Sequence, residues 1–379
     1  MFKRKPKLPT VDTGEYNPYT ATQKKSNKFV TWVKTHKKLA IILACVLVIL
    51  VGAGVASAVY FLNQKPEEPV KVAPKPKPAP EPVKYYSPLT GAQVENEAIT
   101  KQAVTGIMIE NSPDARPQSG LKDSGVVFEA IAEGGITRFL AIYQEQKPQL
   151  IGPVRSVRMY YVDWIAAFNA SVAHIGGSAA ALAEVRNGNY RDIDQFFNAG
   201  AYWRATDRYA PHNVYTSFEK LDALNAAKGY TSSTFTGFTR KDSKSSEAPN
   251  ATSIDVKVSG ALFNSHYTYN AATNSYDRSQ AGAPHTDREA GQISPRVIIA
   301  MKVTEQKVFE DGWREQINAV GNGTAYIFQD GTVQEVTWSK ASRGEQIKFT
   351  DANGADVPLA RGQTWITAVP TSTGGVSWQ

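Results

Sequence analysis

The chain has 379 residues, of which 42% are hydrophobic and 20% are charged, and its formal net charge is +7. This length suffices for two domains with cores of their own, and the composition excludes a chain that is disordered throughout. The single cysteine, Cys45, excludes an intrachain disulfide and any metal site built from several cysteines.

The first two segments predict a membrane anchor. Residues 1–38 carry ten lysines and arginines against Asp12 and Glu15, so we expect a basic cytoplasmic tail. Residues 39–62 contain no charge and are long enough to cross the hydrocarbon core as one transmembrane helix. Because the nearby lysines precede this helix, we expect a single-pass protein of the cell membrane whose globular part is extracytoplasmic and whose bilayer contact is residues 39–62.

Two alternatives for the apolar segment stay open. Ala56–Ala58 resembles a signal cleavage site, but the apolar run before it is longer than a typical signal core, which favours an uncleaved signal anchor. Cys45 lies in a sequence that loosely resembles a lipid-attachment site. Leu43 fits that pattern poorly and the apolar run continues beyond the cysteine, so we interpret Cys45 as part of the membrane helix.

A linker follows the anchor. Residues 63–84 alternate proline with lysine, glutamate and small residues, which is typical of a stiff, extended spacer. The tail and this linker together carry more positive charge than the whole chain, so the remainder is slightly acidic. The basic charge therefore reflects membrane topology and predicts no nucleic-acid partner.

From residue 85 to residue 230 strand and helix patterns alternate, which predicts a mixed α/β domain. Within it, apolar runs at 126–133 and 136–143 flank a Gly-Gly dipeptide typical of a hairpin with a two-residue turn.

Charged residues interrupt both strands of this hairpin. If Glu133 closes the turn, counting places Glu129, Glu133 and Arg138 on one face, whereas a three-residue loop would turn Arg138 to the other face. Such a cluster is either an acid–base site or a cross-strand salt bridge. Both interpretations stay open because structural ion pairs shift the pKa values of their members just as functional sites do.

A helix is expected after the hairpin. Apolar residues from Val157 to Phe168 recur at helical spacing, and Ser156 is the expected N-cap. Arg155 and Arg158 straddle its start and are neighbours on the helix surface. Two forked guanidiniums there would hold a phosphate or carboxylate, or would pair with Asp163 or with the hairpin glutamates.

The next segment predicts a strand at 171–175, containing His174, and then a helix after Gly176, Gly177 and Ser178. Backbone N–H groups at such a turn form a natural anion seat. Ser178 is expected to be an N-cap rather than a nucleophile, because the second glycine of a nucleophile elbow is absent.

Two loops hold further polar candidates. Arg116 precedes Pro117 in a loop that follows a strand predicted at 103–111. A loop rich in aromatic and charged residues carries Arg208, His212 and Asn213, and a lone histidine there is usually structural.

After this loop a capping box of Thr216 and Glu219 predicts the start of a helix that ends at Gly229. Residues 231–253 are rich in Ser, Thr and Lys and suggest a linker or surface excursion.

Residues 254–370 predict a mainly β domain, with strand patterns that include a hairpin across Asp330-Gly331. Trp338 and Trp365 are expected in its core; the alternative is exposed rings that stack on sugars. The overall expectation is an α+β fold: one N-terminal transmembrane helix, a mixed α/β domain and a mainly β C-terminal domain.

Several motifs together resemble the YerB-like family of bacterial surface lipoproteins (DUF3048). They are RPQSGL at Arg116, EGGITRF at Glu133, GPVRSVR at Gly152, HIGGS at His174 and APHNVYT at Ala210, followed by FQDGTVQEVTW and GQTWITAVP in the C-terminal part. The resemblance implies an envelope protein outside the membrane with two adjoining domains, and it implies no chemistry, because the family is a domain of unknown function.

Two functions are compatible with these residues. The first is a tethered binding or scaffold module whose pocket holds an anionic cell-wall component or an envelope protein. The second is a hydrolase or transferase that acts on envelope polymers by acid–base chemistry. A zinc site lacks any local ligand spacing, so we expect no metal and no cofactor. The expected ligand-binding residues are Arg116, Arg138, Arg155, Arg158, Gly176, Gly177, Arg208 and Asn213; the catalytic candidates are Glu129, Glu133, His174 and His212.

Overall fold

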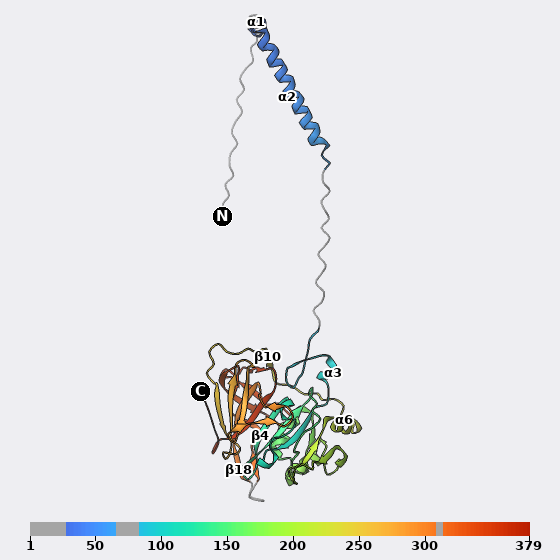
Figure 1. The fold of residues 1–379 in the computed structure, drawn as a ribbon, viewed down its shortest axis with the longest axis vertical. Helices are drawn as coiled ribbons and strands as arrows, with labels where there is room; N and C mark the ends of the chain where they lie inside the picture. The colour runs from blue at the N-terminus through green and yellow to red at the C-terminus, as the bar shows by residue number, and fades with distance from the viewer. Residues whose placement is uncertain (1–27, 66–82, 308–313) are drawn as a thin grey trace, which may run out of the picture. The chain divides into compact units, whose positions relative to one another are not determined.

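The computed structural model describes residues 28–65, 83–307 and 314–379. The chain divides into two compact units, Met1–Pro80 and Glu81–Gln379, and all the described strands lie in the second (Figure 1).

The first unit contains two helices, α1 (Lys28–Thr35) and α2 (Lys37–Asn63). No residue of α2 is buried, and its most apolar window has a mean hydropathy of 3.0. By length and composition this helix is able to cross a membrane. Residues 39–62 therefore coincide with one apolar helix, on which Cys45 is exposed.

The second unit is built on one mixed sheet of ten strands. Its central strands are apolar almost throughout, as expected for a sheet covered on both faces. In spatial order the strands are β22 (Lys348–Thr350), β21 (Thr332–Lys340), β20 (Gly321–Gln329), β17 (Val297–Val303), β24 (Thr364–Pro370), β4 (Val126–Glu133), β5 (Ile136–Tyr143), β3 (Thr105–Glu110), β6 (Ser171–Ala173) and β7 (Arg191–Asp192).

The sheet joins segments that are distant in sequence. Strand β24, near the C-terminus, pairs in parallel with β4, and Trp365 lies opposite Val127. Residues 231–253 join the same unit through a separate two-stranded sheet, in which β10 (Arg240–Lys241) pairs in parallel with β23 (Leu359–Ala360). The domain boundary expected at 231–253 stays a prediction. Strands from before and after this segment belong to the same ten-stranded sheet.

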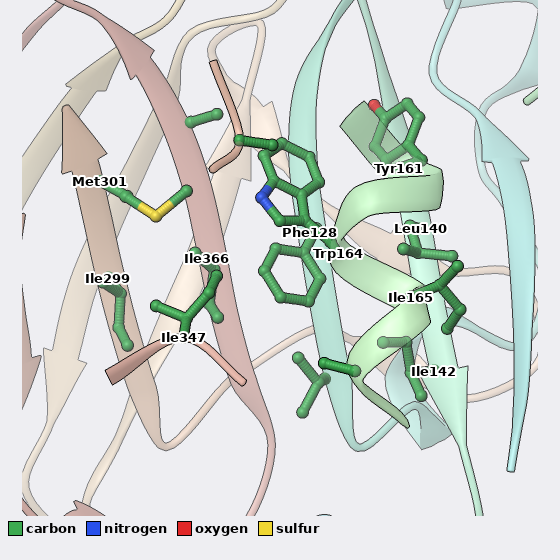
Figure 2. Packing of buried hydrophobic residues seen from close by; sticks show 14 of the residues in the cluster. Phe128, Leu140, Ile142, Tyr161, Trp164, Ile165, Ile299, Met301, Ile347 and Ile366 are labelled. Carbon is green, nitrogen blue, oxygen red and sulfur yellow. The ribbon is translucent and has the colours of Figure 1, made fainter. Parts of the chain in front are cut away.

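Alternate residues of each strand supply the two faces. On one face Phe128 of β4 stacks on Trp164 of helix α4 (Met159–Ile165), with ring centroids 5.0 Å apart. Figure 2 shows this stack, with Ile366 and Met301 of neighbouring strands in the same layer. This hydrophobic layer fixes α4, and with it the charged residues at its start.

The opposite face is covered by α6 (Phe218–Ala227) and by a second sheet of five strands. The strands of this second sheet are β14 (Ala283–Pro284), β13 (Ser275–Gln280), β12 (Ser265–Asn270), β11 (Ser253–Lys257) and β25 (Gly375–Trp378).

Short elements complete the unit. The remaining helices are α3 (Glu97–Thr100) and α5 (Ala179–Asn187), with 3-10 turns at Pro113–Ala115, Leu121–Asp123, Ala166–Phe168 and Ala199–Ala201. The remaining strand pairs are β1 (Tyr85–Tyr86) with β2 (Gln93–Val94), β8 (Tyr202–Arg204) with β9 (Val214–Thr216), β15 (Thr286–Asp287) with β16 (Gly291–Gln292), and β18 (Glu305–Lys307) with β19 (Glu315–Ile317).

The mixed α/β organisation with a mainly β C-terminal region agrees with the sequence, and so do several local features. Trp338 and Trp365 are buried, and the Ser178 side chain caps α5 by accepting from the Ala181 amide. Asp330 and Gly331 both have positive φ between β20 and β21, as a tight hairpin turn requires.

Two helix starts differ from the prediction. Helix α4 begins at Met159, so Ser156 is not its N-cap. Helix α6 is capped by Ser217, whose hydroxyl accepts from the Lys220 amide, while Thr216 lies in β9. The capping box was wrong by one residue because the strand pairing extends to Thr216.

Candidate functional site

The hairpin of β4 and β5 contains a bulge that changes which residues share a face. The two-glycine turn is present as predicted, but the register shifts between Ile131 and Glu133, so that Ala130 lies opposite Arg138. One extra residue in a strand turns the residues before it to the other face. The prediction that Glu129, Glu133 and Arg138 share one face was therefore wrong: Glu129 lies on the opposite side of the sheet.

Glu133 forms a cluster with two arginines near the start of α4. Its Oε1 lies 2.7 Å from Arg138 Nη2, and its Oε2 accepts from Arg158. Arg138 also donates to the Ser156 carbonyl at 2.8 Å. Burial alone would raise the pKa of Glu133, but the two guanidiniums outweigh it and hold that pKa below the usual value. The carboxylate is thus kept ionised and paired.

Arg158 also lines a cavity of about 560 Å³, together with the start of α5 and residues 314–320. A second arginine of this cavity, Arg343, lies 2.5 Å from Asp163 and 2.5 Å from Glu184. The positive charges of Arg158 and Arg343 are thus matched by carboxylates of the protein.

Glu129 belongs to a closed network inside the second unit. It receives hydrogen bonds from Arg278 Nη2 at 3.0 Å and from Trp365 Nε1 at 2.9 Å, and the Thr137 hydroxyl lies 3.2 Å away. The Arg278 guanidinium also lies over the Trp365 ring, 4.6 Å from its centroid. Glu129 and Arg278 are both fully buried, so neither offers a surface to a ligand.

His285 extends this closed network. Its Nε2 lies 3.0 Å from the Gln118 side-chain oxygen, and its Nδ1 contacts Arg278. Burial, and then the charges of Arg278 and Arg116, hold the pKa of His285 well below the ordinary value. We call Glu129, Arg278, Trp365, Gln118 and His285 the buried network.

The glycine turn at Gly176 is occupied by the protein itself. Asp194, which is fully buried, accepts from the Gly176 amide at 3.2 Å. His174 is also fully buried, and its nitrogens contact the Gly176 carbonyl at 2.8 Å and Asp192 at 3.0 Å. Gly177 lies against Val157, where a side chain would meet the Val157 backbone. The expected anion seat is thus filled by an internal carboxylate.

A second cavity gathers three of the candidates from the sequence. Arg116, Arg208 and His212 line a depression of about 640 Å³, together with Arg288. Asp114, Pro117, Asp207 and Tyr209 complete the lining. We call this depression the arginine pocket.

The positive charges of two arginines in this pocket have no carboxylate partner. Arg116 donates to both oxygens of Asn111, at 3.1 and 2.9 Å. Arg208 donates to the carbonyls of Asp114 and Pro117, at 3.0 and 2.6 Å. Within the described ranges, neither guanidinium lies within ion-pair distance of a carboxylate. Carbonyl oxygens orient both groups, and neither charge is met by an ion pair.

A buried carboxylate lies beneath the arginine pocket. Glu110 Oε1 lies 2.8 Å from His212 Nδ1 and 3.3 Å from Arg155 Nε, and it accepts from the Ser112 hydroxyl at 2.9 Å. The Glu110 side chain is only 4% exposed, whereas that of His212 is 23% exposed. The histidine therefore connects an internal acid to the pocket surface.

Asn213 holds the loop that carries Arg208 and His212 by hydrogen bonds. Its side-chain amide donates to the carbonyls of Ala205 and Arg208, and its side-chain oxygen accepts from Arg204 at 2.7 Å. These contacts fix the chain on both sides of Arg208. Asn213 is therefore placed to hold the loop that presents Arg208 and His212.

Sequence reasoning missed Glu110 and Arg288. Glu110 ends an apolar strand, and a charge in such a run was the signal used for the hairpin, so it was available from the sequence. Arg288 gave no such signal, because its closeness to Arg208 arises from the pairing of distant strands. No group of three or more residues able to hold a metal occurs among the residues that the structure places.

Comparison with known proteins gives consistent results. A family pattern described as "Protein of unknown function (DUF3048) N-terminal domain" matches residues 89–231, and the C-terminal domain of the same family matches residues 254–366. The chain belongs to the DUF3048 family. The arginine pocket takes residues from both DUF3048 domains, since Arg288 lies in the second and the other arginines lie in the first.

One DUF3048 relative is the Bacillus subtilis (strain 168) protein named "Putative lipoprotein YerB". It is 33% identical over 292 residues, which cover 76% of this chain and 87% of the relative. A crystal structure of YerB from Bacillus subtilis superposes with a TM-score of 0.70 at 32% identity, covering 78% of this chain and 100% of that chain.

Proposed function

We propose that this DUF3048 protein is a binding or scaffold module outside the cell membrane, which holds an anionic polymer of the cell envelope in the arginine pocket. Helix α2 anchors it with the N-terminus in the cytoplasm, because lysines and arginines concentrate before the helix and at its first residues, where the positive-inside rule places the cytoplasmic side. The name of the relative, "Putative lipoprotein YerB", supports an envelope location.

In this chain the anchor is α2 itself rather than a lipid. Cys45 lies inside the apolar helix, with further apolar residues on both sides. A lipidated cysteine begins a polar linker, whereas here the polar linker begins after Asn63. Globomycin, which blocks cleavage of lipoprotein precursors, is therefore expected to leave the size of the protein unchanged.

The observation that carries the function is the pair of arginines without carboxylate partners. Three guanidiniums and one imidazole face two aspartates in the arginine pocket, and one aspartate is taken by Arg288, whose Nη2 lies 2.6 Å from Asp207. Arg116 and Arg208 remain to attract an anion. Forked guanidiniums match phosphate and carboxylate oxygens.

The test is a calorimetric titration of the full chain in mild detergent with poly(glycerol phosphate). We expect saturable binding that weakens as salt rises, because the charges face solvent. Arg208→Ala should lower the affinity by about 10-fold or more, as expected for a lost charged hydrogen bond. The matched control is Arg296→Ala, which removes an arginine that donates to the Thr273 carbonyl outside the pocket.

Two comparison ligands sharpen the result. Polyglutamate tests whether any polyanion suffices, and neutral dextran tests for binding to sugars or to polyols. If the wild type does not bind poly(glycerol phosphate), or if Arg208→Ala and Arg296→Ala bind it equally, the proposal is wrong.

Three of the four catalytic candidates for a hydrolase or transferase are buried or paired within the protein. Glu129 and His174 are fully buried, and Glu133 is paired with two arginines. Of the four catalytic candidates, His212 is the one that faces the arginine pocket.

A further inference from the structure

The orientation of His212 separates its two nitrogens. Nδ1 points inward to Glu110 Oε1, at 2.8 Å, while Nε2 points to Asp114, whose Oδ2 lies 3.9 Å away and whose side chain is 82% exposed. When the Glu110 carboxylate is ionised it can only accept, so Nδ1 donates in this contact, and in the neutral form of the ring the lone pair is then on Nε2. The basic nitrogen therefore faces the arginine pocket.

This arrangement has the parts of a general base. A buried carboxylate fixes the tautomer and the orientation of the imidazole, as in hydrolases that use a His–carboxylate pair. The two aspartates of the pocket are exposed, and the guanidiniums of Arg116 and Arg208, which have no ion-pair partner among the described residues, line the same cavity. Positive groups beside a base are suited to a reaction in which an anion gains further charge.

The nearby hydroxyl is not placed to be the nucleophile. The Ser112 hydroxyl lies 3.2 Å from His212 Nδ1 and donates to Glu110, so it is on the inner side of the ring. A group activated by Nε2 must come from the pocket side, which is open to solvent. Water is the nucleophile that this geometry admits.

We propose that the arginine pocket hydrolyses phosphodiester bonds of an anionic envelope polymer, with His212 as the catalytic general base. This inference rests on the proposed function, because the same arginines must first bind the polymer. Arg116 and Arg208 hold the non-bridging oxygens of the diester, and Glu110 is a positioning residue that acts through His212.

The reaction is a hydrolysis whose reactants are the phosphodiester and one water molecule. A water molecule gives a proton to His212 Nε2 while its oxygen forms a bond to phosphorus. The phosphorus–oxygen bond to one polyol breaks, and the leaving oxygen takes a proton from solvent. His212 then returns its proton to solvent. The products are a phosphomonoester end and an alcohol end.

The experiment measures binding and turnover on the same full chain in mild detergent. Glycerol 3-phosphate, a monoester that the reaction does not cleave, reports binding by calorimetry. Poly(glycerol phosphate) reports turnover, because each cleavage creates a monoester end that ³¹P NMR detects. We expect His212→Gln to lower kcat by at least about 100-fold, the usual range for a general base, with affinity for glycerol 3-phosphate changed less than about 3-fold.

Controls separate chemistry from folding. His266→Gln removes another histidine bonded to a carboxylate, Asp255 at 2.9 Å, and should leave kcat unchanged. Glu110→Gln should lower kcat by about 10-fold at unchanged KM, since it disturbs orientation and not binding. The thermal midpoint of each variant shows whether it is folded. If His212→Gln or Glu110→Gln is not folded, the kcat of His212→Asn is measured in its place.

Each outcome has a defined meaning. Binding by the wild type without new monoester ends between pH 5 and 9 overturns this inference and leaves the binding function standing. Turnover that is equal in wild type and His212→Gln also overturns it. A His212→Gln protein with a lower thermal midpoint and unchanged kcat shows that the Glu110–His212 bond is structural. No binding of either phosphate ligand removes the proposed function as well.

Discussion

The buried network and the arginine pocket each combine arginine, histidine and a carboxylate, yet their arginines have different partners. In the buried network Arg278 faces Glu129 at 3.0 Å and both are fully buried. In the arginine pocket Arg116 and Arg208 face carbonyl oxygens and an open depression. A fully buried guanidinium is costly without a carboxylate partner, whereas one beside solvent is not. A charged side chain that lines a cavity without an ion-pair partner is thus a better indication of a ligand site than a charged residue in an apolar strand.

The largest effect is expected in the buried network. Arg278→Met removes one partner and leaves the Glu129 carboxylate buried and unpaired, which should lower the free energy of unfolding by about 3–5 kcal/mol. The measurement is urea unfolding of the full chain in mild detergent. Adding Glu129→Gln to Arg278→Met should recover part of this loss, since no unpaired charge remains. If Arg278→Met lowered the free energy of unfolding by less than about 1 kcal/mol, the contrast between the buried network and the arginine pocket would be wrong.

The Glu133 cluster lies between the two extremes, because it is paired but partly exposed. The pKa of Glu133 is lowered, so its contribution to stability is present above the unfolded value of about 4.3 and is lost as pH falls through the folded pKa. Glu133→Gln should lower the free energy of unfolding by about 1–3 kcal/mol at pH 7. The difference from wild type should shrink toward pH 3, and a constant difference would contradict the ion pair.

His285 gives the buried network a dependence on pH. Its folded pKa lies well below the unfolded value of about 6.5, so the unfolded chain binds more protons below that value. Stability should therefore fall by up to about 1.4 kcal/mol per pH unit below pH 6.5. Thermal unfolding of wild type and His285→Gln between pH 5 and 8 isolates this slope. Parallel curves for the two proteins would show that His285 is not buried as a neutral ring.

The smallest effect on stability is expected in the arginine pocket. Arg208→Ala removes hydrogen bonds to two exposed loop carbonyls, and substitutions of this kind usually change the free energy of unfolding by less than about 1 kcal/mol. The same urea unfolding as for Arg278→Met measures it. A loss comparable with that of Arg278→Met would show that Arg208 is mainly a structural tie.

Local sequence patterns predicted the elements well. The two-glycine hairpin, the caps at Ser178 and Gly229, and the strands on both sides of Asp330-Gly331 depend on neighbouring residues and were found. The bulge after Ile131 was not, because a bulge depends on how β4 meets its partners rather than on its own pattern. One residue of register then decided the face on which Glu129 lies.

The partners of the charged residues depend on long-range pairing. Glu129 and Arg278 are 149 residues apart, and no local pattern distinguishes Arg278 from the other charged residues of the mainly β segment. Arg208 and His212 were singled out as loop residues, but their closeness to Arg116 and Arg288 follows from the folded unit. Residue type and local context identified candidates, while their grouping required the topology.

The most direct test measures affinity and stability together in Arg116→Ala/Arg208→Ala. The account predicts that this double variant of the full chain still folds, with a thermal midpoint lowered by several degrees because Arg116 also bonds to Asn111 and Leu262, and binds poly(glycerol phosphate) at least about 100-fold more weakly. An unchanged affinity, with or without a lower midpoint, would contradict the claim that the arginine pocket is the binding site.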